Sequence, residues 1–271
     1  MIVTQSIHNH TTFDDGKHSP AEMASSALSL GLSGLGLTAH SPMDNEFWTV
    51  KPERMAEYRA ELARLKAEYA GRMDVWCGLE YDLTSDPKWL DGFDYVIASV
   101  HALKTDRGLW ALDDNRERSR RMIVIAFDGD ADAAAEAYFA KVSQIAQIDR
   151  ADIVGHFDLI TKFDEPEPLY DAASPRYRLS ALDAMEALAK AGKIFEINTG
   201  AMSRGYRSSP YPAPALLRAL REMGGRVTIT ADAHSRENLT FAFDQAEAAA
   251  RAAGFKELWE FDGALFTPRA L

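Results

Sequence analysis

The stretch SIHNHTTFDDGKHSP, residues 6–20, holds three of the seven histidines of this 271-residue chain together with two aspartates. It overlaps a short run rich in apolar residues, IVTQSI at residues 2–7, which predicts a strand. Alternate side chains of an extended strand point to the same side, so His8 and His10 can reach one centre. The stretch therefore predicts a functional site at the end of the first strand.

Six more short apolar runs predict strands further along the chain, at residues 33–38, 73–79, 93–100, 152–155, 193–198 and 226–230. These runs are mostly continuous rather than alternating, as in strands that are buried on both faces. Helical patterns separate them, and a strict strand–helix alternation favours a parallel sheet. Seven or eight such units in 271 residues favour a single α/β barrel over an open sheet, with residues 254–268 as an eighth, irregular strand.

The helices between these strands have recognisable starts and periodic apolar stripes. Ser19-Pro20-Ala21-Glu22 is a capping box, and that helix is expected to run to Gly31. The other helices are predicted at residues 52–70, 132–148, from 180 to 192, near 216–223 and at 238–253. The segments 103–120 and 161–179 are predicted as loops over one rim, and the whole chain, 1–271, as one domain.

Composition excludes several classes of protein. Apolar residues make up 46% and charged residues 26% of the chain, a globular balance, and no apolar run approaches the length of a membrane span. The single cysteine cannot form an internal disulfide, and together with a start that lacks signal-peptide features it predicts a cytoplasmic protein. The net charge of −11 argues against a nucleic-acid partner. The run Arg116, Arg118, Arg120 and Arg121 is interpreted as a solvated helix face.

The histidines share one kind of position, because each follows the end of a predicted strand or lies in the loop after one. The set, with the carboxylates at the same ends, is His8, His10, Asp15, His18, His40, Glu80, His101, His156, Asp232 and His234. The carboxyl ends of barrel strands meet on one face, where imidazole and carboxylate groups suit zinc, manganese or iron. Ten such groups exceed the needs of one ion and predict two or three divalent ions. Asp15 and His18 are alternatives for one role, since both lie in the same glycine turn.

The order H-x-H, D-G, H, E, H, H, D-x-H resembles the PHP (polymerase and histidinol phosphatase) superfamily over nearly the whole chain. The phrases GLEYD, DYVIASVH, IVGHFDLITKF, FEINTGAMSRGYRSSPYP and ADAH are similar to its histidinol-phosphate phosphatase branch. The resemblance implies a distorted (β/α)7 barrel with a trinuclear metal centre. It implies one ion on His8, His10, Glu80 and Asp232, a second on Glu80, His101 and His156, and a third on His40, His234 and the loop after the first strand.

A multinuclear site of this kind suits hydrolysis of a phosphate monoester by a hydroxide held between two ions. The expected substrate is therefore a small phosphorylated molecule, with L-histidinol phosphate as the first candidate. Arg204 or Arg207 is predicted to bind the phosphate with Asn198 in support, and Asp232 or His18 to protonate the leaving alcohol. Five residues after the second and third strands, Glu46, Phe47, Trp48, Tyr81 and Asp82, are candidates for a pocket wall.

Two other functions remain open on the sequence. One is a PHP phosphoesterase that acts on nucleotides, such as a 3′,5′-bisphosphate phosphatase, or on nucleic-acid ends. The other is a non-catalytic binding module on an inherited barrel, which the complete set of candidate ligands makes the weaker hypothesis.

Overall fold

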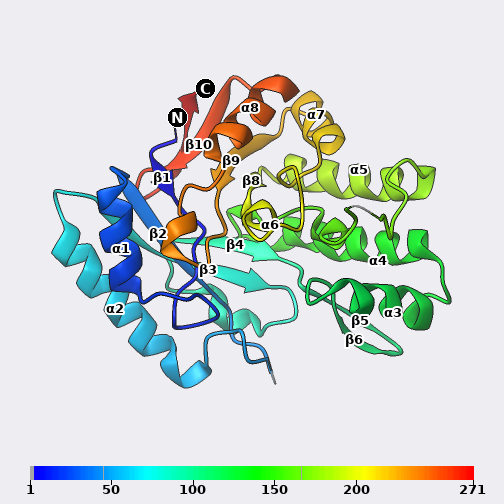
Figure 1. Ribbon diagram of the computed structural model, residues 1–271, viewed down its shortest axis with the longest axis horizontal. Coiled ribbons are helices and arrows are strands. Elements are labelled where there is room, and N and C mark those ends of the chain that lie inside the picture. The colour runs from blue at the N-terminus through cyan, green and yellow to red at the C-terminus, as the bar shows by residue number, and fades with distance from the viewer. Residues whose placement is uncertain (1–2, 45, 166) are drawn as a thin grey trace.

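A computed structural model describes residues 3–44, 46–165 and 167–271, and its centre is a seven-stranded parallel sheet (Figure 1). The strands are β1 (Gln5–Ser6), β2 (Gly34–His40), β3 (Asp74–Asp82), β4 (Tyr95–Ser99), β7 (Ile153–Val154), β8 (Ile194–Asn198) and β9 (Arg226–Thr230). They pair in chain order, and a parallel bridge between Asn9 and Ala233 brings the two edges together. The predicted (β/α)7 barrel is thereby confirmed.

Helices surround this barrel (Figure 1). They are α1 (Pro20–Ser29), α2 (Met55–Tyr69), α3 (Arg116–Ala126), α4 (Ala131–Ser143), α5 (Pro175–Lys190), α6 (Gly200–Ser203), α7 (Pro214–Glu222) and α8 (Phe243–Ala253). In the described part of the chain, five short 3₁₀ turns accompany them: η1 (Pro52–Arg54), η2 (Pro87–Leu90), η3 (Gln144–Gln147), η4 (Leu159–Thr161) and η5 (Arg236–Asn238). The predicted capping box is present at α1, where the Ser19 hydroxyl accepts a hydrogen bond from Glu22 N and the Glu22 carboxylate accepts one from Ser19 N.

The expected eighth strand is wrong. Residues 254–268 contribute instead to an antiparallel hairpin, β10 (Glu257–Phe261) and β11 (Phe266–Ala270), which forms its own two-stranded sheet. The turn at Asp262 reverses the chain, because its carboxylate accepts hydrogen bonds from the backbone N–H groups of Ala264 and Leu265. The chain therefore folds back on itself before it can pair with the barrel.

Three predicted boundaries also differ from the structure. The supposed loop 103–120 contains a second hairpin, β5 (Ala102–Thr105) with β6 (Gly108–Ala111), and the start of α3. Helix α5 begins at Pro175 rather than at residue 180, since proline suits the first helical position after Ser174. Helix α8 begins at Phe243 because the residues before it form η5 and a turn.

The amino end of the barrel is filled by large apolar side chains. Trp76 and Tyr95 lie inside, and Phe261 of the β10–β11 hairpin contacts both rings, with centroid distances of 5.3 and 5.1 Å. Glycine makes room for them: a Cβ atom at Gly36 would lie 1.8 Å from the Tyr95 hydroxyl, which donates a hydrogen bond to Ile7 O. The barrel interior is therefore a packed core at this end, and polar side chains occupy the other end.

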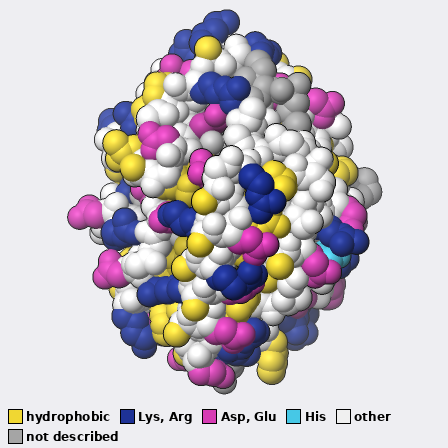
Figure 2. Space-filling model, turned by 90° about the vertical axis from the view of Figure 1, so that its left-hand side faces the viewer, with side chains coloured by type: hydrophobic (Ala, Val, Ile, Leu, Met, Phe, Trp, Pro, Cys, Tyr) yellow, Lys and Arg dark blue, Asp and Glu magenta, His cyan; other side chains and the backbone are white. Residues whose placement is uncertain are grey.

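The outer surface carries mixed charge. Figure 2 shows one face, on which Lys and Arg side chains are interspersed with Asp and Glu side chains. Arginines of α3 make ion pairs with neighbouring carboxylates: Arg116 with Glu167, Arg118 with Asp114 and Arg120 with Glu117. This agrees with a solvated helix face. Among the described helices, none combines the length and the apolar character that a membrane span requires.

Candidate metal centre

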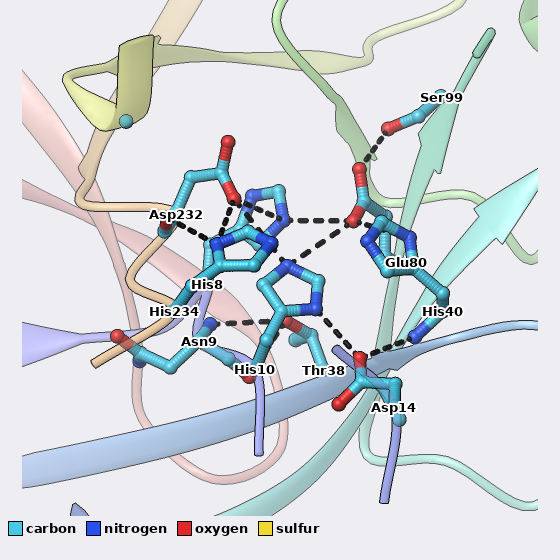
Figure 3. Close-up of polar contacts among 12 residues, drawn as sticks. His8, Asn9, His10, Asp14, Thr38, His40, Glu80, Ser99, Asp232 and His234 are labelled. Carbon is cyan, nitrogen blue, oxygen red and sulfur yellow. Dashed lines mark hydrogen bonds and ion pairs between the residues drawn. The ribbon is translucent and has the colours of Figure 1, made fainter. Parts of the chain in front are cut away.

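The carboxyl ends of the strands bring most of the predicted ligands together around Glu80, the seventh residue of β3 (Figure 3). Its Oε2 atom faces three imidazole nitrogens: His8 Nε2 at 3.1 Å, His10 Nε2 at 3.3 Å and His40 Nδ1 at 3.0 Å. Its Oε1 atom faces two more, His156 Nε2 at 3.0 Å and His101 Nε2 at 3.4 Å. The side chain is 1% exposed. A carboxylate that faces a separate set of imidazoles with each oxygen has the arrangement of a bridge between two ions.

A second carboxylate, Asp232, lies on the other side of His8 and His10, the two histidines that follow β1 (Figure 3). Its Oδ1 atom is 3.4 Å from His10 Nε2 and 3.9 Å from His8 Nε2. Asp232 adopts a φ of 46°, so the chain bends here instead of continuing as an extended strand. The bend still leaves Asp232 beside His234, whose Nδ1 atom lies 3.5 Å from the same oxygen.

The loop after β1 contributes Asp15 to this cluster. Asp15 Oδ2 lies 3.2 Å from His234 Nε2, and Asp15 Oδ1 lies 3.8 Å from His40 Nε2. His18 is oriented differently, since its Nδ1 atom accepts a hydrogen bond from Arg236 N and its Nε2 atom lies 3.9 Å from Glu237. The geometry therefore favours Asp15 over His18 as the ligand from this loop.

The ligand atoms form three overlapping groups, each with its atoms within 4.8 Å of one another. The groups are His8, His10 and Asp232; His40, Glu80 and His101; and His10, Asp15, His40 and His234. Within the described part of the chain, four of the buried atoms have no hydrogen-bond partner: His8 Nε2, His10 Nε2, His40 Nδ1 and Glu80 Oε2. Buried polar atoms without partners are costly, and several that converge on one point fit a bound cation.

Three carboxylates lie behind the histidines: Glu196 and Asp14 were not predicted from the sequence, and Asp82 was predicted in a pocket wall instead. Each contacts an Nδ1 atom: Glu196 that of His8 at 2.8 Å, Asp14 that of His10 at 2.7 Å and Asp82 that of His101 at 3.2 Å. This contact leaves the Nε2 atom of each ring directed at the cluster, as in metal sites where a carboxylate orients the ligand. A charged residue inside the apolar run KIFEIN was the available signal for Glu196.

Two hydroxyl groups at strand ends contact the carboxylates Glu80 and Glu196. Ser99 Oγ donates a hydrogen bond to Glu80 Oε1 at 2.7 Å, and Thr230 Oγ1 donates one to Glu196 Oε2 at 2.8 Å. Both hydroxyls are buried and occupy strand ends, so they orient carboxylates without reaching solvent.

The electrostatics of the cluster favour positive charge. Burial alone lowers the pKa of His10, but the Asp14 carboxylate at its Nδ1 atom, with Asp232 and Asp15, raises that pKa to about 10. Burial raises the pKa of Glu80, yet the imidazoles of His40, His8 and His101 hold it well below its usual range. The buried carboxylates thus require nearby cations, which protonated imidazoles or bound divalent ions can supply.

The candidate substrate residues follow β8. Arg204 contacts the cluster directly, since its guanidinium donates to Asp232 Oδ2 at 3.1 Å and lies 3.0 Å from His234 Nδ1. Arg207 is directed elsewhere, stacking 4.3 Å from the Tyr211 ring centre and donating a hydrogen bond to Thr161 Oγ1. The structure therefore brings only one of the two predicted arginines into contact with the cluster.

Asn198 is fully buried beneath these groups. Its Nδ2 atom donates to Glu196 Oε1 at 2.7 Å and lies 3.4 Å from Asp232 Oδ2, while its Oδ1 atom accepts from Gly200 N. This position suits support of the cluster rather than direct contact with a substrate.

Trp48 is the predicted wall residue that borders the cluster. Its ring lies edge-on to His40 at a centroid distance of 4.6 Å and 5.4 Å from the ring of His101. Glu46 accepts a hydrogen bond from the Trp48 indole N–H. Tyr81 and Asp82 are instead buried, the first donating to Ser85 O and the second accepting from His101 N, so they form no accessible wall.

Known proteins that are similar to this chain identify its family. A model of the PHP domain matches residues 6–200, most of the chain. This chain belongs to the PHP domain family. The PHP protein is 34% identical over 239 residues to the "Probable histidinol-phosphatase" of Deinococcus radiodurans, with 84% of each chain covered. It is 25% identical over 260 residues to the histidinol-phosphatase of Bacillus subtilis, covering 88% of this chain and 96% of the relative.

A solved structure agrees with the fold of the PHP protein. The histidinol phosphate phosphatase of Lactococcus lactis, crystallised with zinc, L-histidinol and phosphate, superimposes with a TM-score of 0.74. The match covers 98% of this chain and 99% of the other at 22% sequence identity, a similarity that supports the barrel architecture.

Proposed function

We propose that this PHP protein is a metal-dependent phosphomonoesterase that hydrolyses L-histidinol phosphate to L-histidinol and phosphate. The observation that carries the proposal is the set of buried imidazole and carboxylate atoms that converge on Glu80 without hydrogen-bond partners. The relatives named histidinol-phosphatase, which this chain matches over most of its length, support the substrate. A cytoplasmic location in histidine biosynthesis belongs to the same proposal.

The metal ligands of the proposal are based on the three groups of atoms, with His156 in place of His40 beside Glu80 and His101 because its Nε2 atom lies 3.0 Å from Glu80 Oε1. His8, His10 and Asp232 would hold one ion, Glu80 with His101 and His156 a second, and Asp15 with His40 and His234 a third. Zinc, manganese and iron all suit this mixture of imidazole and carboxylate ligands. Bound ions of this kind polarise a phosphate ester and lower the pKa of water, which supplies hydroxide near neutral pH.

Arg204 is proposed to bind the phosphate. Its guanidinium lies at the edge of the cluster, and a planar donor pair fits two phosphate oxygens. Arg207 is proposed to hold the loop after β8, since it contacts Thr161 and Tyr211 rather than the cluster. Asn198 is proposed to hold Asp232 and Glu196 in place.

The proton donor for the leaving alcohol remains a prediction between Asp232 and His18. Burial raises the pKa of Asp232, but Arg204 and His8 hold it well below its usual range, which favours a ligand role over a proton-donor role. His18 lies on the rim and is 20% exposed, so it is the better candidate of the two.

Steady-state phosphate release tests the proposal. The protein, loaded separately with zinc, manganese and iron(II), would be assayed on L-histidinol phosphate, AMP, a 3′,5′-bisphosphate nucleotide and an aryl phosphate. We expect L-histidinol phosphate to exceed the others at least hundredfold in kcat/KM, equivalent to about 2.7 kcal/mol of transition-state discrimination.

The matched control for this assay is Glu80→Gln, which keeps the size of the side chain and removes the bridging charge. Its turnover should fall to background, so any activity that persists in it measures a contaminating phosphatase. A higher kcat/KM for the bisphosphate nucleotide or AMP would overturn the substrate, and absence of turnover on all four esters would overturn the class of reaction.

A further inference from the structure

Strand β8 provides no histidine to the centre, but it places one carboxylate deep inside the barrel. Glu196 is fully buried in the middle of the strand. Its ion pair within the described chain is with His8, at 2.8 Å. A buried charge of this kind is costly unless every lone pair is satisfied, so its partners indicate what it does.

Four groups contact the Glu196 carboxylate. Three of them are hydrogen-bond donors, and the fourth, His8 Nδ1, donates when it carries a proton. Oε1 accepts from the backbone N–H of His156 at 2.5 Å and from Asn198 Nδ2 at 2.7 Å. Oε2 accepts from Thr230 Oγ1 at 2.8 Å and lies 2.8 Å from His8 Nδ1. The amide of Asn198 cannot be turned round without loss, because its Oδ1 atom already accepts from Gly200 N at 2.8 Å.

The charge of Glu196 therefore determines where His8 carries its proton. An ionised carboxylate only accepts hydrogen bonds, so His8 Nδ1 must be protonated. In the neutral ring that binds a metal, the lone pair is then on Nε2, which lies 3.1 Å from Glu80 Oε2 in the candidate metal centre. The same carboxylate holds the backbone of His156, a second proposed ligand.

We propose that Glu196 is a positioning residue that sets the Nδ1–H tautomer of His8 and so makes His8 Nε2 available as a metal ligand. This inference rests on the metal centre of the proposed function and is independent of the substrate. It extends to the reaction, because a His8 ring that is misoriented or protonated at Nε2 would weaken the binding of one ion in the centre.

A glutamine at this position distinguishes the tautomer from simple packing. Gln has the size of Glu but presents one oxygen and one NH₂ group. The NH₂ group cannot face the backbone N–H of His156, which is a fixed donor. The NH₂ group must therefore take the position of Oε2, where it donates to its neighbours. The Thr230 hydroxyl can rotate to accept this hydrogen bond, but His8 can accept one only if Nδ1 carries no proton. The proton of His8 then moves to Nε2 and blocks the metal position.

The test measures zinc affinity and the state of the His8 ring in the wild-type protein and in three variants. Zinc affinity is measured by competition with a chromophoric chelator. The ring nitrogens are observed by ¹⁵N–¹H NMR of zinc-loaded protein labelled at histidine, with the His8 signals identified by their loss in His8→Asn. In the wild type we expect a protonated Nδ1 and an unprotonated, metal-bound Nε2.

We expect Glu196→Gln to lose the His8 Nδ1–H signal and to bind zinc about 10- to 100-fold more weakly at one site. Thr230→Val is the matched control, because it removes a donor from the same Glu196 oxygen and leaves His8 its acceptor. It should retain the Nδ1–H signal and bind zinc within about threefold of the wild type. Glu196→Asp, which is still a pure acceptor, should retain the tautomer with intermediate affinity.

Two results would overturn the inference: a wild-type His8 that is unprotonated at Nδ1, or a Glu196→Gln protein with wild-type zinc affinity and signals. If circular dichroism shows that Glu196→Gln does not fold, the wild-type spectrum and Glu196→Asp decide, and loss of the Nδ1 proton in the Asp variant also refutes the proposal. Failure of the wild type to bind zinc would instead overturn the proposed function. A different preferred ester would overturn only the substrate.

Discussion

In the metal-free protein, protonated imidazoles balance the buried carboxylates. The stability of this form should therefore fall as the pH rises above neutrality, because keeping these imidazoles protonated becomes more costly. The clearest case is His10, whose pKa rises from 6.5 to about 10 in the folded state beside Asp14. A pKa that folding raises adds stability below the unfolded value of 6.5, and this stability is lost as the pH approaches 10. Between about pH 6.5 and about pH 8.5, the loss from His10 alone is about 2 kcal/mol.

In this pH interval the effect of the imidazoles on stability can be measured without that of the buried cysteine. Burial raises the pKa of Cys77 to about 12, from 9.0, so its effect on stability begins only near pH 9. His8 and His101 also have pKa values raised by carboxylates after the opposing effect of burial. They share Glu80 with His10, so their contributions do not add independently.

Urea unfolding of chelator-treated protein across this interval measures the effect. The zinc-loaded protein is one control, since metal-bound imidazoles are neutral and zinc affinity increases with pH. His10→Gln is the second, and its metal-free stability should decline less steeply than that of the wild type. Metal-free wild-type protein that gains stability from about pH 6.5 to about pH 8.5, or a His10→Gln slope equal to that of the wild type, would refute the reasoning.

Three further predictions concern the ligand loop, the phosphate site and the barrel core. Asp15→Asn should weaken zinc binding about 10- to 100-fold at one site, while His18→Asn should leave the zinc content unchanged. Metal analysis after dialysis checks both variants, and the reverse pattern would favour His18 as the ligand. Arg204→Lys should raise KM for the phosphate ester and lower kcat/KM about tenfold or more, because an ammonium cannot replace the planar donor pair; unchanged kinetics would exclude Arg204 from the phosphate site. Gly36→Ala should destabilise the fold by about 3 kcal/mol, since its methyl group would lie 1.8 Å from the Tyr95 hydroxyl. Adding Tyr95→Phe should recover part of that loss in the double variant. Equal losses of unfolding free energy in the single and double variants, measured by urea unfolding, would contradict this contact.

The barrel was predictable because its seven parallel strands are short, apolar and separated by helices with clear start and stop signals. The hairpin β10–β11 was not, because a strand that pairs with the barrel and a strand that folds back have the same local pattern. The capping box at Ser19 was confirmed, since it depends on neighbours three residues apart. The start of α5 was missed because a polar first turn resembles a loop.

The sequence by itself determined which residues stand at the carboxyl ends of the strands, and hence the candidate ligands, because strand ends and residue types are local properties. Only the tertiary structure shows that Asp15 is directed at the cluster and His18 is not, and that Arg204 contacts it while Arg207 does not, because each pair differs in direction rather than in position along the chain. The contacts of Glu196 likewise depend on the tertiary structure. Its four donors come from strands β8 and β9 and from residues that follow β1 and β7, and their convergence exists only once the barrel has closed.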